Sequence, residues 1–164
     1  ELMTDLGTDP PQIRRAGPDD LSSATTLVEH AWTASNAEFL PSTTITLLTA
    51  ENSIAGLIAS RSQELWLAEL RGTLAAVLGV DTSGYVWACY VHPDHQRKGI
   101  GGALMSAVKA YFKEKDVTFL YLDLIDGNTS AQTFYLAQGW VEESRRPESL
   151  PDHTATAIRL TYAL

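Results

Sequence analysis

The stretch that decides the fold is residues 85–105, YVWACYVHPDHQRKGIGGALM. An apolar strand pattern over 85–91 leads into a short polar loop, and an amphipathic helix pattern begins at Gly99. Glycines leave the backbone N–H groups of a helix N-terminus open, and the helix dipole adds partial positive charge there. The sequence therefore predicts that this loop binds an anion such as a phosphate.

The loop lacks the two commonest nucleotide-binding spacings. There is no Gly, four residues, then Gly-Lys-Ser/Thr, and Gly99 and Gly101 are followed by Leu104 where a dinucleotide motif needs a third glycine. The pattern that fits is Gln-x-x-Gly-x-Gly, formed by Gln96, Gly99 and Gly101 directly after a strand. A solvated loop without a ligand is the alternative. The position between a strand and an amphipathic helix favours the anion site.

The rest of the chain alternates between strand and helix patterns. Strands are expected at 12–16, 64–70, 73–80, 85–91, 117–125, 140–146 and 154–163, and helices at 17–32, in one or two pieces over 43–61, at 99–115 and at 128–139. Short links predict an antiparallel meander over 64–91, and the unit 85–124 is expected to be parallel and right-handed.

The two ends of the chain carry weaker patterns. The last two strands are expected to be joined by a loop over 147–154. Residues 1–11 show no periodicity and are predicted to be a disordered tail, which leaves 12–164 as one domain.

Composition excludes several classes of protein. The 164 residues contain no run of about 18 apolar side chains, so no membrane span is expected. A net charge of −8 argues against nucleic acid and anionic membranes as partners. The single cysteine, Cys89, excludes an internal disulfide, and we expect a reducing, cytoplasmic location. The four histidines have no metal-site spacing, so no metal is expected, and His92 and His95 are expected to be solvated.

Two consecutive segments carry a family resemblance. CYVHPDHQRKGIGGALM (89–105) and LYLDLIDGNTSAQTFYLAQGW (120–140) together resemble the acetyl-CoA-binding core of the GCN5-related N-acetyltransferases (GNAT family). The resemblance covers 85–140 closely, and the order of elements over 12–163 is compatible with it. It implies a single-domain α/β fold with a mixed, mostly antiparallel sheet. A central parallel pair of strands would be splayed to admit CoA, with helices on both faces.

The resemblance also implies which residues bind the cosubstrate. The pantetheine arm would pair with the open backbone of the strand before the loop, and the pyrophosphate would sit on the amides from Arg97 to Gly102. Asn128 matches a position that commonly contacts the cofactor. The implied set is Cys89, Tyr90, Val91, Gln96, Arg97, Lys98, Gly99, Ile100, Gly101, Gly102 and Asn128. A side chain at Gly101 is expected to block the phosphate.

Three residues are candidates for the chemistry. Tyr135 matches the tyrosine that protonates the departing thiolate in many relatives, although an aromatic residue on an amphipathic helix is usually core. Asp123 falls where some relatives keep a basic glutamate, and the alternative is a carboxylate bound to backbone donors. Glu69, in the strand pattern 64–70, is the other candidate base. The backbone N–H of Val91 is implied as the oxyanion donor.

The resemblance predicts transfer of acetyl from acetyl-CoA to a primary amine by direct attack in a ternary complex. Two alternatives stay open: another acyl-CoA or acceptor, or a CoA-binding regulatory module without catalysis. The acceptor would be a small molecule or a peptide or protein amine, selected by 33–45 and 146–154. A homodimer is also kept open.

Overall fold

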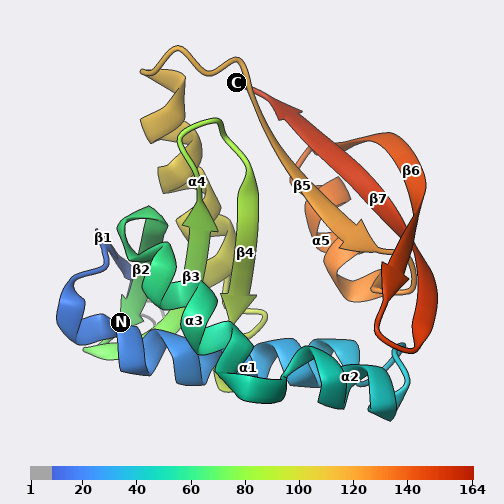
Figure 1. The fold of residues 1–164 in the computed structure, drawn as a ribbon. Helices are drawn as coiled ribbons and strands as arrows, with labels where there is room; N and C mark the ends of the chain where they lie inside the picture. The colour runs from blue at the N-terminus through green and yellow to red at the C-terminus, as the bar shows by residue number, and fades with distance from the viewer. Residues whose placement is uncertain (1–8) are drawn as a thin grey trace, which may run out of the picture.

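The computed structural model describes residues 9–164 and contains two β-sheets, the first of which has helices on both faces (Figure 1). The first sheet has the order β1-β2-β3-β4 and the second the order β5-β7-β6. The strands are β1 (Gln12–Arg15), β2 (Leu65–Leu70), β3 (Thr73–Val80), β4 (Val86–Val91), β5 (Phe119–Ile125), β6 (Val141–Leu150) and β7 (His153–Ala163). The helices are α1 (Leu21–Asn36), α2 (Ser42–Leu48), α3 (Ser53–Ser60), α4 (Ile100–Lys113) and α5 (Thr129–Ala137).

The antiparallel meander is confirmed over β2, β3 and β4. Arg71 and Gly72 join β2 to β3, and their φ angles of 54° and 79° are typical of the tight hairpin turn that matches strand twist. Both inner strands are almost wholly buried because helices cover the two faces of this sheet.

Two apolar cores lie on opposite faces of the first sheet. On one face α1 and α3 bury side chains such as Leu27 and Ile58 against Val77. On the other face α4 packs residues such as Leu104 against Leu78, and this core continues to Leu122 and Tyr135 in the second sheet and α5. The alternation of strand side chains assigns each residue to one core or the other.

The two sheets meet at a single parallel contact between β4 and β5. Tyr85 pairs with Tyr121, and the Tyr121 N–H donates to the Gly84 carbonyl at 3.0 Å. Within residues 9–164 no further ladder pair joins these strands, and Figure 1 shows the gap between them widening toward their C-terminal ends. The predicted splayed parallel pair is confirmed.

The expected loop over 147–154 is wrong. β6 continues to Leu150 and β7 starts at His153, so that only Pro151 and Asp152 turn the hairpin. The sequence misleads here because Pro147 interrupts the strand pattern. β6 is an edge strand, where a proline without an N–H is tolerated.

The N-terminal helix pattern also differs in detail from its expectation over 17–32. A short 3₁₀ turn at Pro18–Asp20 precedes α1, which continues to Asn36. Of the predicted tail, residues 1–8 lie outside the described residues. Residues 9–11 form no helix or strand, and Asp9 accepts a hydrogen bond from Arg71 at 3.2 Å. In the part of the chain that is described, no helix is long and apolar enough to cross a bilayer.

Candidate active site

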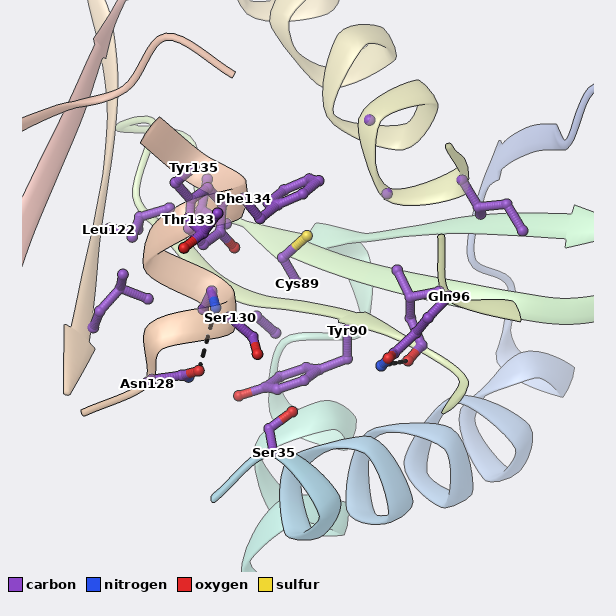
Figure 2. A pocket seen from close by; sticks show the side chains of 18 of the residues that line it. Ser35, Cys89, Tyr90, Gln96, Leu122, Asn128, Ser130, Thr133, Phe134 and Tyr135 are labelled. Carbon is purple, nitrogen blue, oxygen red and sulfur yellow. Dashed lines mark hydrogen bonds between the residues drawn. The ribbon is translucent and has the colours of Figure 1, made fainter. Parts of the chain in front are cut away.

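A cavity of about 820 Å³ occupies the gap between β4 and β5 (Figure 2). Its walls come from β4, the loop before α4, the first turn of α4, β5 and α5, with Ser35 of α1 at one side. Twelve of the residues predicted from the sequence line it: Cys89, Tyr90, Val91, Gln96, Arg97, Gly99, Ile100, Gly101, Gly102, Asp123, Asn128 and Tyr135.

The open edge of β4 presents unpaired backbone groups to this cavity. The His92 N–H donates to the Ala75 carbonyl at 2.8 Å, toward β3. Because backbone groups alternate in direction along a strand, Val91 and Cys89 direct their N–H and C=O groups away from β3, into the gap. The Val91 carbonyl accepts a hydrogen bond from the Gln96 side chain at 3.4 Å. This edge suits an extended ligand that carries amide groups.

The start of α4 forms the second part of the cavity. The first bond within the helix runs from the Ala103 N–H to the Gly99 carbonyl at 3.0 Å, so the N–H groups of residues 100–102 have no acceptor inside the helix. The loop turns into α4 through Arg97 and Gly99, whose φ angles are 64° and 76°. The open amides and the Arg97 guanidinium fit a diphosphate.

Two neighbouring glycines in α4 have different roles. A Cβ on Gly101 would lie 3.2 Å from Cγ2 of Val91 and 3.4 Å from the Phe134 ring, so Gly101 allows α4 to approach β4 and α5 closely. Gly101 therefore has a packing role, and the expectation that a side chain there would block the phosphate stays a prediction. At Gly102 the nearest side chain, Gln138, is 3.5 Å away, which leaves room for a side chain.

Tyr135 is only 6% exposed and lies on α5, the helix that follows β5. The Asn128 side chain caps this helix by accepting from the Ala131 N–H at 3.3 Å. Burial, and then the neighbouring Cys89 thiol with which the phenol shares a hydrogen bond, raise the pKa of Tyr135 well above its usual value. The phenol therefore holds its proton at neutral pH and is available as an acid.

Cys89 faces the same cavity from β4. Burial raises the pKa of its thiol to about 11, although the hydrogen bond with Tyr135 lowers it. The side chain is therefore a neutral thiol at physiological pH, which is unsuited to nucleophilic attack.

Asp123 lines the cavity, but its carboxylate is held by two arginines. Arg159 donates from Nε and Nη2 at 2.9 and 3.0 Å, and Arg146 donates twice at 3.3 Å. Burial favours a higher pKa for Asp123, but the bonds from these arginines outweigh it and lower the pKa below its usual range. A carboxylate so tightly bound is a poor base. The alternative to a base that was expected from the sequence was a carboxylate bound to backbone donors. In the structure the groups that hold Asp123 are arginine side chains.

Glu69 does not line the cavity. Its carboxylate accepts from Nε of Arg14 at 2.6 Å, and the same guanidinium binds both carboxylate oxygens of Asp20 at 2.8 Å. Glu69 therefore ties β2 to β1 and to the start of α1, and the candidate base is placed away from the site. Lys98 is exposed and does not line the cavity either.

Tyr90 was predicted as a binding residue without a role for its side chain, and Ser35 was not among the predicted site residues. Figure 2 shows the Tyr90 side chain extending toward the start of α5, with Ser35 beside it. Strand alternation already places the Tyr90 side chain on the face opposite Cys89, so its position could have been inferred. Ser35 carries no such signal, because nothing in the α1 sequence marks its contact with the gap.

The histidines near the loop are less solvated than expected. His92 and His95 are half-buried, their rings lie 5.7 Å apart, and His30 of α1 packs 5.3 Å from His92. His95 lines the cavity, and its Nδ1 is buried without a hydrogen-bond partner in the described structure. Among residues 9–164 no group of three or more potential ligands is arranged to hold a metal ion.

The fold and site define an acetyl-CoA-binding acyltransferase, with a splayed strand pair beside an open helix N-terminus. The sequence profile described as "Acetyltransferase (GNAT) family" matches residues 24–140, and the chain belongs to this family. It is an acetyltransferase, and acetyl-CoA is its acetyl donor.

Known proteins similar to this chain agree with that membership. The aminoglycoside N(6′)-acetyltransferase type 1 of Stenotrophomonas maltophilia is 28% identical over 82% of this chain and 89% of its own. A GCN5-related N-acetyltransferase from Rhodopseudomonas palustris superposes with a TM-score of 0.79 at 18% identity, over 96% of this chain and 98% of its own. The Salmonella typhimurium protein yncA, solved with its cofactor acetyl-CoA, gives a TM-score of 0.71 at 16% identity, over 94% of each chain.

Proposed function

We propose that the protein transfers acetyl from acetyl-CoA directly to a primary amine in a ternary complex within the β4–β5 gap. One observation carries the proposal. The open backbone of β4, the free amides at the start of α4 and the protonated Tyr135 all line the same cavity.

Binding of acetyl-CoA is assigned to three parts of the chain. The backbone of Cys89 and Val91 pairs with the pantetheine arm, and the amides of residues 100–102 receive the diphosphate with Arg97 at the rim. Asn128 contributes its side-chain NH₂, since its oxygen caps α5. Tyr90 lines the cavity with its side chain, because its backbone groups point toward β3.

The bound acetyl-CoA supplies a thioester whose carbonyl carbon is attacked by the amine, so that a C–N bond forms and the C–S bond breaks. The Val91 N–H, which points into the gap, donates to the oxygen that gains negative charge. Tyr135 gives its proton to the sulfur that departs and regains one from solvent. Both groups are held in place by β4 and α5 before the substrate arrives.

The amine enters as the free base. Of the described residues, Asp123 is the one carboxylate that lines the cavity, and two arginines occupy it. The proton that the nitrogen loses during attack therefore passes to water. An amine of low pKa is the better acceptor at neutral pH, because more of it is unprotonated.

The acceptor that we propose is a cationic small molecule of the aminoglycoside kind. A relative that covers most of this chain is named for that activity. Acidic side chains in the segments expected to select the acceptor agree with it: Glu38 and Asp152. The positive charges of the β6 arginines are balanced within the fold. Arg145 pairs with Glu142, and Arg146, which shares Asp123 with Arg159, also pairs with Glu148.

An amine panel tests the proposal. Release of free CoA thiol is followed with aminoglycosides, polyamines, lysine peptides and free amino acids, and the acetylated product is identified by mass spectrometry. Turnover with an aminoglycoside supports the acceptor class. Acetylation of lysine peptides alone contradicts that class but keeps the chemistry, and acetyl-CoA binding without release for any amine contradicts both.

Three further expectations concern the extent of the domain, the location of the protein and its oligomeric state. We propose residues 12–164 as the catalytic domain, a cytoplasmic location in keeping with the one cysteine, and a homodimer. The exposed edge strand β6, with Val141 63% exposed, is a surface that a second copy could cover. Light scattering at several protein concentrations gives the mass in solution; a constant monomer mass contradicts the dimer.

A further inference from the structure

We infer that Asp123 is a positioning residue that sets the width of the β4–β5 gap by linking Tyr85 on one side to Arg159 and Arg146 on the other. The inference rests on the proposed function, because it gives this gap its role in acetyl transfer. It replaces the expectation that Asp123 acts as a base.

The closed end of the gap is fixed by polar and ring contacts around the single bridge. The rings of Tyr85 and Tyr121 lie 5.1 Å apart, and the Tyr121 hydroxyl is 3.0 Å from Oγ of Ser83. Asp81 accepts from the N–H and the hydroxyl of Ser83 at 2.9 and 2.6 Å and from the Tyr85 N–H at 3.0 Å. These contacts hold the two strands together up to residue 121.

Asp123 occupies the first position beyond the bridge on the same face of β5. Side chains two residues apart share a face of a strand, so Asp123 follows Tyr121 at the point where the gap opens. The Tyr85 hydroxyl reaches across and donates to Oδ2 of Asp123 at 3.4 Å. This bond is a side-chain link between β4 and β5 beyond the last backbone bond.

The arginines fix Asp123 from the other side. Arg159 is the register partner of Asp123 on β7, donates to both of its carboxylate oxygens, and stacks 5.0 Å over the Tyr121 ring. Arg146 adds two bonds from β6. Paired bonds between a guanidinium and a carboxylate define orientation as well as distance. The carboxylate, 17% exposed, thus connects four strands.

The width of the β4–β5 gap decides how far Tyr135 lies from the Val91 N–H. α5 follows β5 after residues 126–128, so a shift of β5 carries Tyr135 toward or away from the Val91 N–H on β4. The acid and the oxyanion donor stand on opposite sides of the gap. A fixed width is needed to keep them at the distance that the thioester requires.

The first test measures the gap without relying on activity. Asp123→Asn and Tyr85→Phe are compared with the wild type by NMR hydrogen exchange of the Tyr121 amide, which closes the bridge. Asp123→Asn is expected to speed exchange at Tyr121 at least tenfold, and Tyr85→Phe several-fold, with the Val108 amide in α4 unchanged. Unchanged exchange at Tyr121 in both variants overturns the inference. If Asp123→Asn does not fold by circular dichroism, Tyr85→Phe alone decides.

The second test separates positioning from base catalysis. With an amine acceptor, Asp123→Asn is expected to lower kcat about tenfold while the pH profile of kcat keeps its shape. Loss of the acid limb of the profile identifies a base and overturns the inference, as does an unchanged kcat. Glu142→Gln, which breaks an exposed pair with Arg145 on the same sheet, is the control that leaves both readouts unchanged. A wild type inactive with every amine contradicts the proposed function, whereas the exchange measurement still reports on the gap.

Discussion

Tyr121 donates its backbone N–H to the carbonyl oxygen of Gly84 at 3.0 Å, and β4 and β5 diverge from this bond onward. The divergence leaves the N–H and C=O groups of Val91 and Cys89 without strand partners. In most sheets such groups would be paired by the next strand. Here they line a cavity that a linear amide-bearing ligand can enter, and we propose the break in the sheet as the binding site.

Replacing Tyr135 with phenylalanine removes the proposed acid and keeps the ring that packs against Trp140 at 5.5 Å. We expect kcat to fall by about 10²-fold, the scale of one positioned acid, with acetyl-CoA affinity nearly unchanged. Steady-state rates and calorimetric titration measure the two effects. Tyr90→Phe, which removes the other tyrosine hydroxyl in the cavity, is the matched comparison. An undiminished kcat in Tyr135→Phe would remove this residue from the mechanism.

The pH dependence of kcat/KM should follow the acceptor and not the enzyme. Because no free carboxylate lines the described cavity, the amine must lose its proton before attack, and the rate rises with pH up to the pKa of the amine. An α-amine levels off near pH 8, and a lysine-type amine goes on rising to about 10.4. Initial rates with one acceptor of each kind are the measurement. The same midpoint for both acceptors would reveal an enzymatic base.

The glycines of α4 separate packing from ligand binding. Gly101→Val forces a side chain against Val91 and Phe134, and overpacking of this kind costs about 1–3 kcal/mol, so Tm falls. A Cβ at Gly102 meets only the Gln138 side chain, at 3.5 Å, and lies beside the open amides. We therefore expect Gly102→Leu to weaken acetyl-CoA binding and to lower Tm less than Gly101→Val does. Thermal melts and calorimetry measure both variants. Equal affinities in Gly102→Leu and the wild type would argue against a diphosphate at this turn.

Acid stability should depend on the ion pairs that anchor β1. Hydrogen bonds from Arg14, then from the Gly17 N–H, lower the pKa of Asp20 from 3.8 to about 2. Because the folded-state pKa is the lower one, the stabilisation is present above about pH 4 and is lost as the pH falls toward 2. Asp20→Asn should flatten the dependence of the unfolding free energy on pH in this window. Urea melts at several pH values measure it, and an unaltered slope would contradict the assignment.

The sequence was most informative where short-range patterns decide structure. The meander, the loop before α4 and the amphipathic stripe on α4 all depend on neighbours in the chain, and their positions were predicted to within a few residues. The partners of Asp123 could not be predicted in this way. Arg146 and Arg159 lie 23 and 36 residues away, and the register of β6 on β7 brings them together.

The wrong prediction that Glu69 acts as a catalytic base has a similar cause. Glu69 and Arg14 are 55 residues apart and meet because β1 pairs with β2. The alternation of residues along a strand gives the face on which Glu69 lies. It does not give the strand that lies next to it, and this neighbour decides whether the carboxylate is free or bound.

The measurement that tests the central claim most directly is a single turnover with acetyl-CoA labelled in its acetyl group, quenched with and without an aminoglycoside. Direct transfer predicts that the label stays on CoA without the amine and moves to the amine, with no labelled protein, when the amine is present. Label on the protein would contradict direct attack. Label that remains on CoA with every amine would contradict the assignment of the cavity as a site of acetyl transfer.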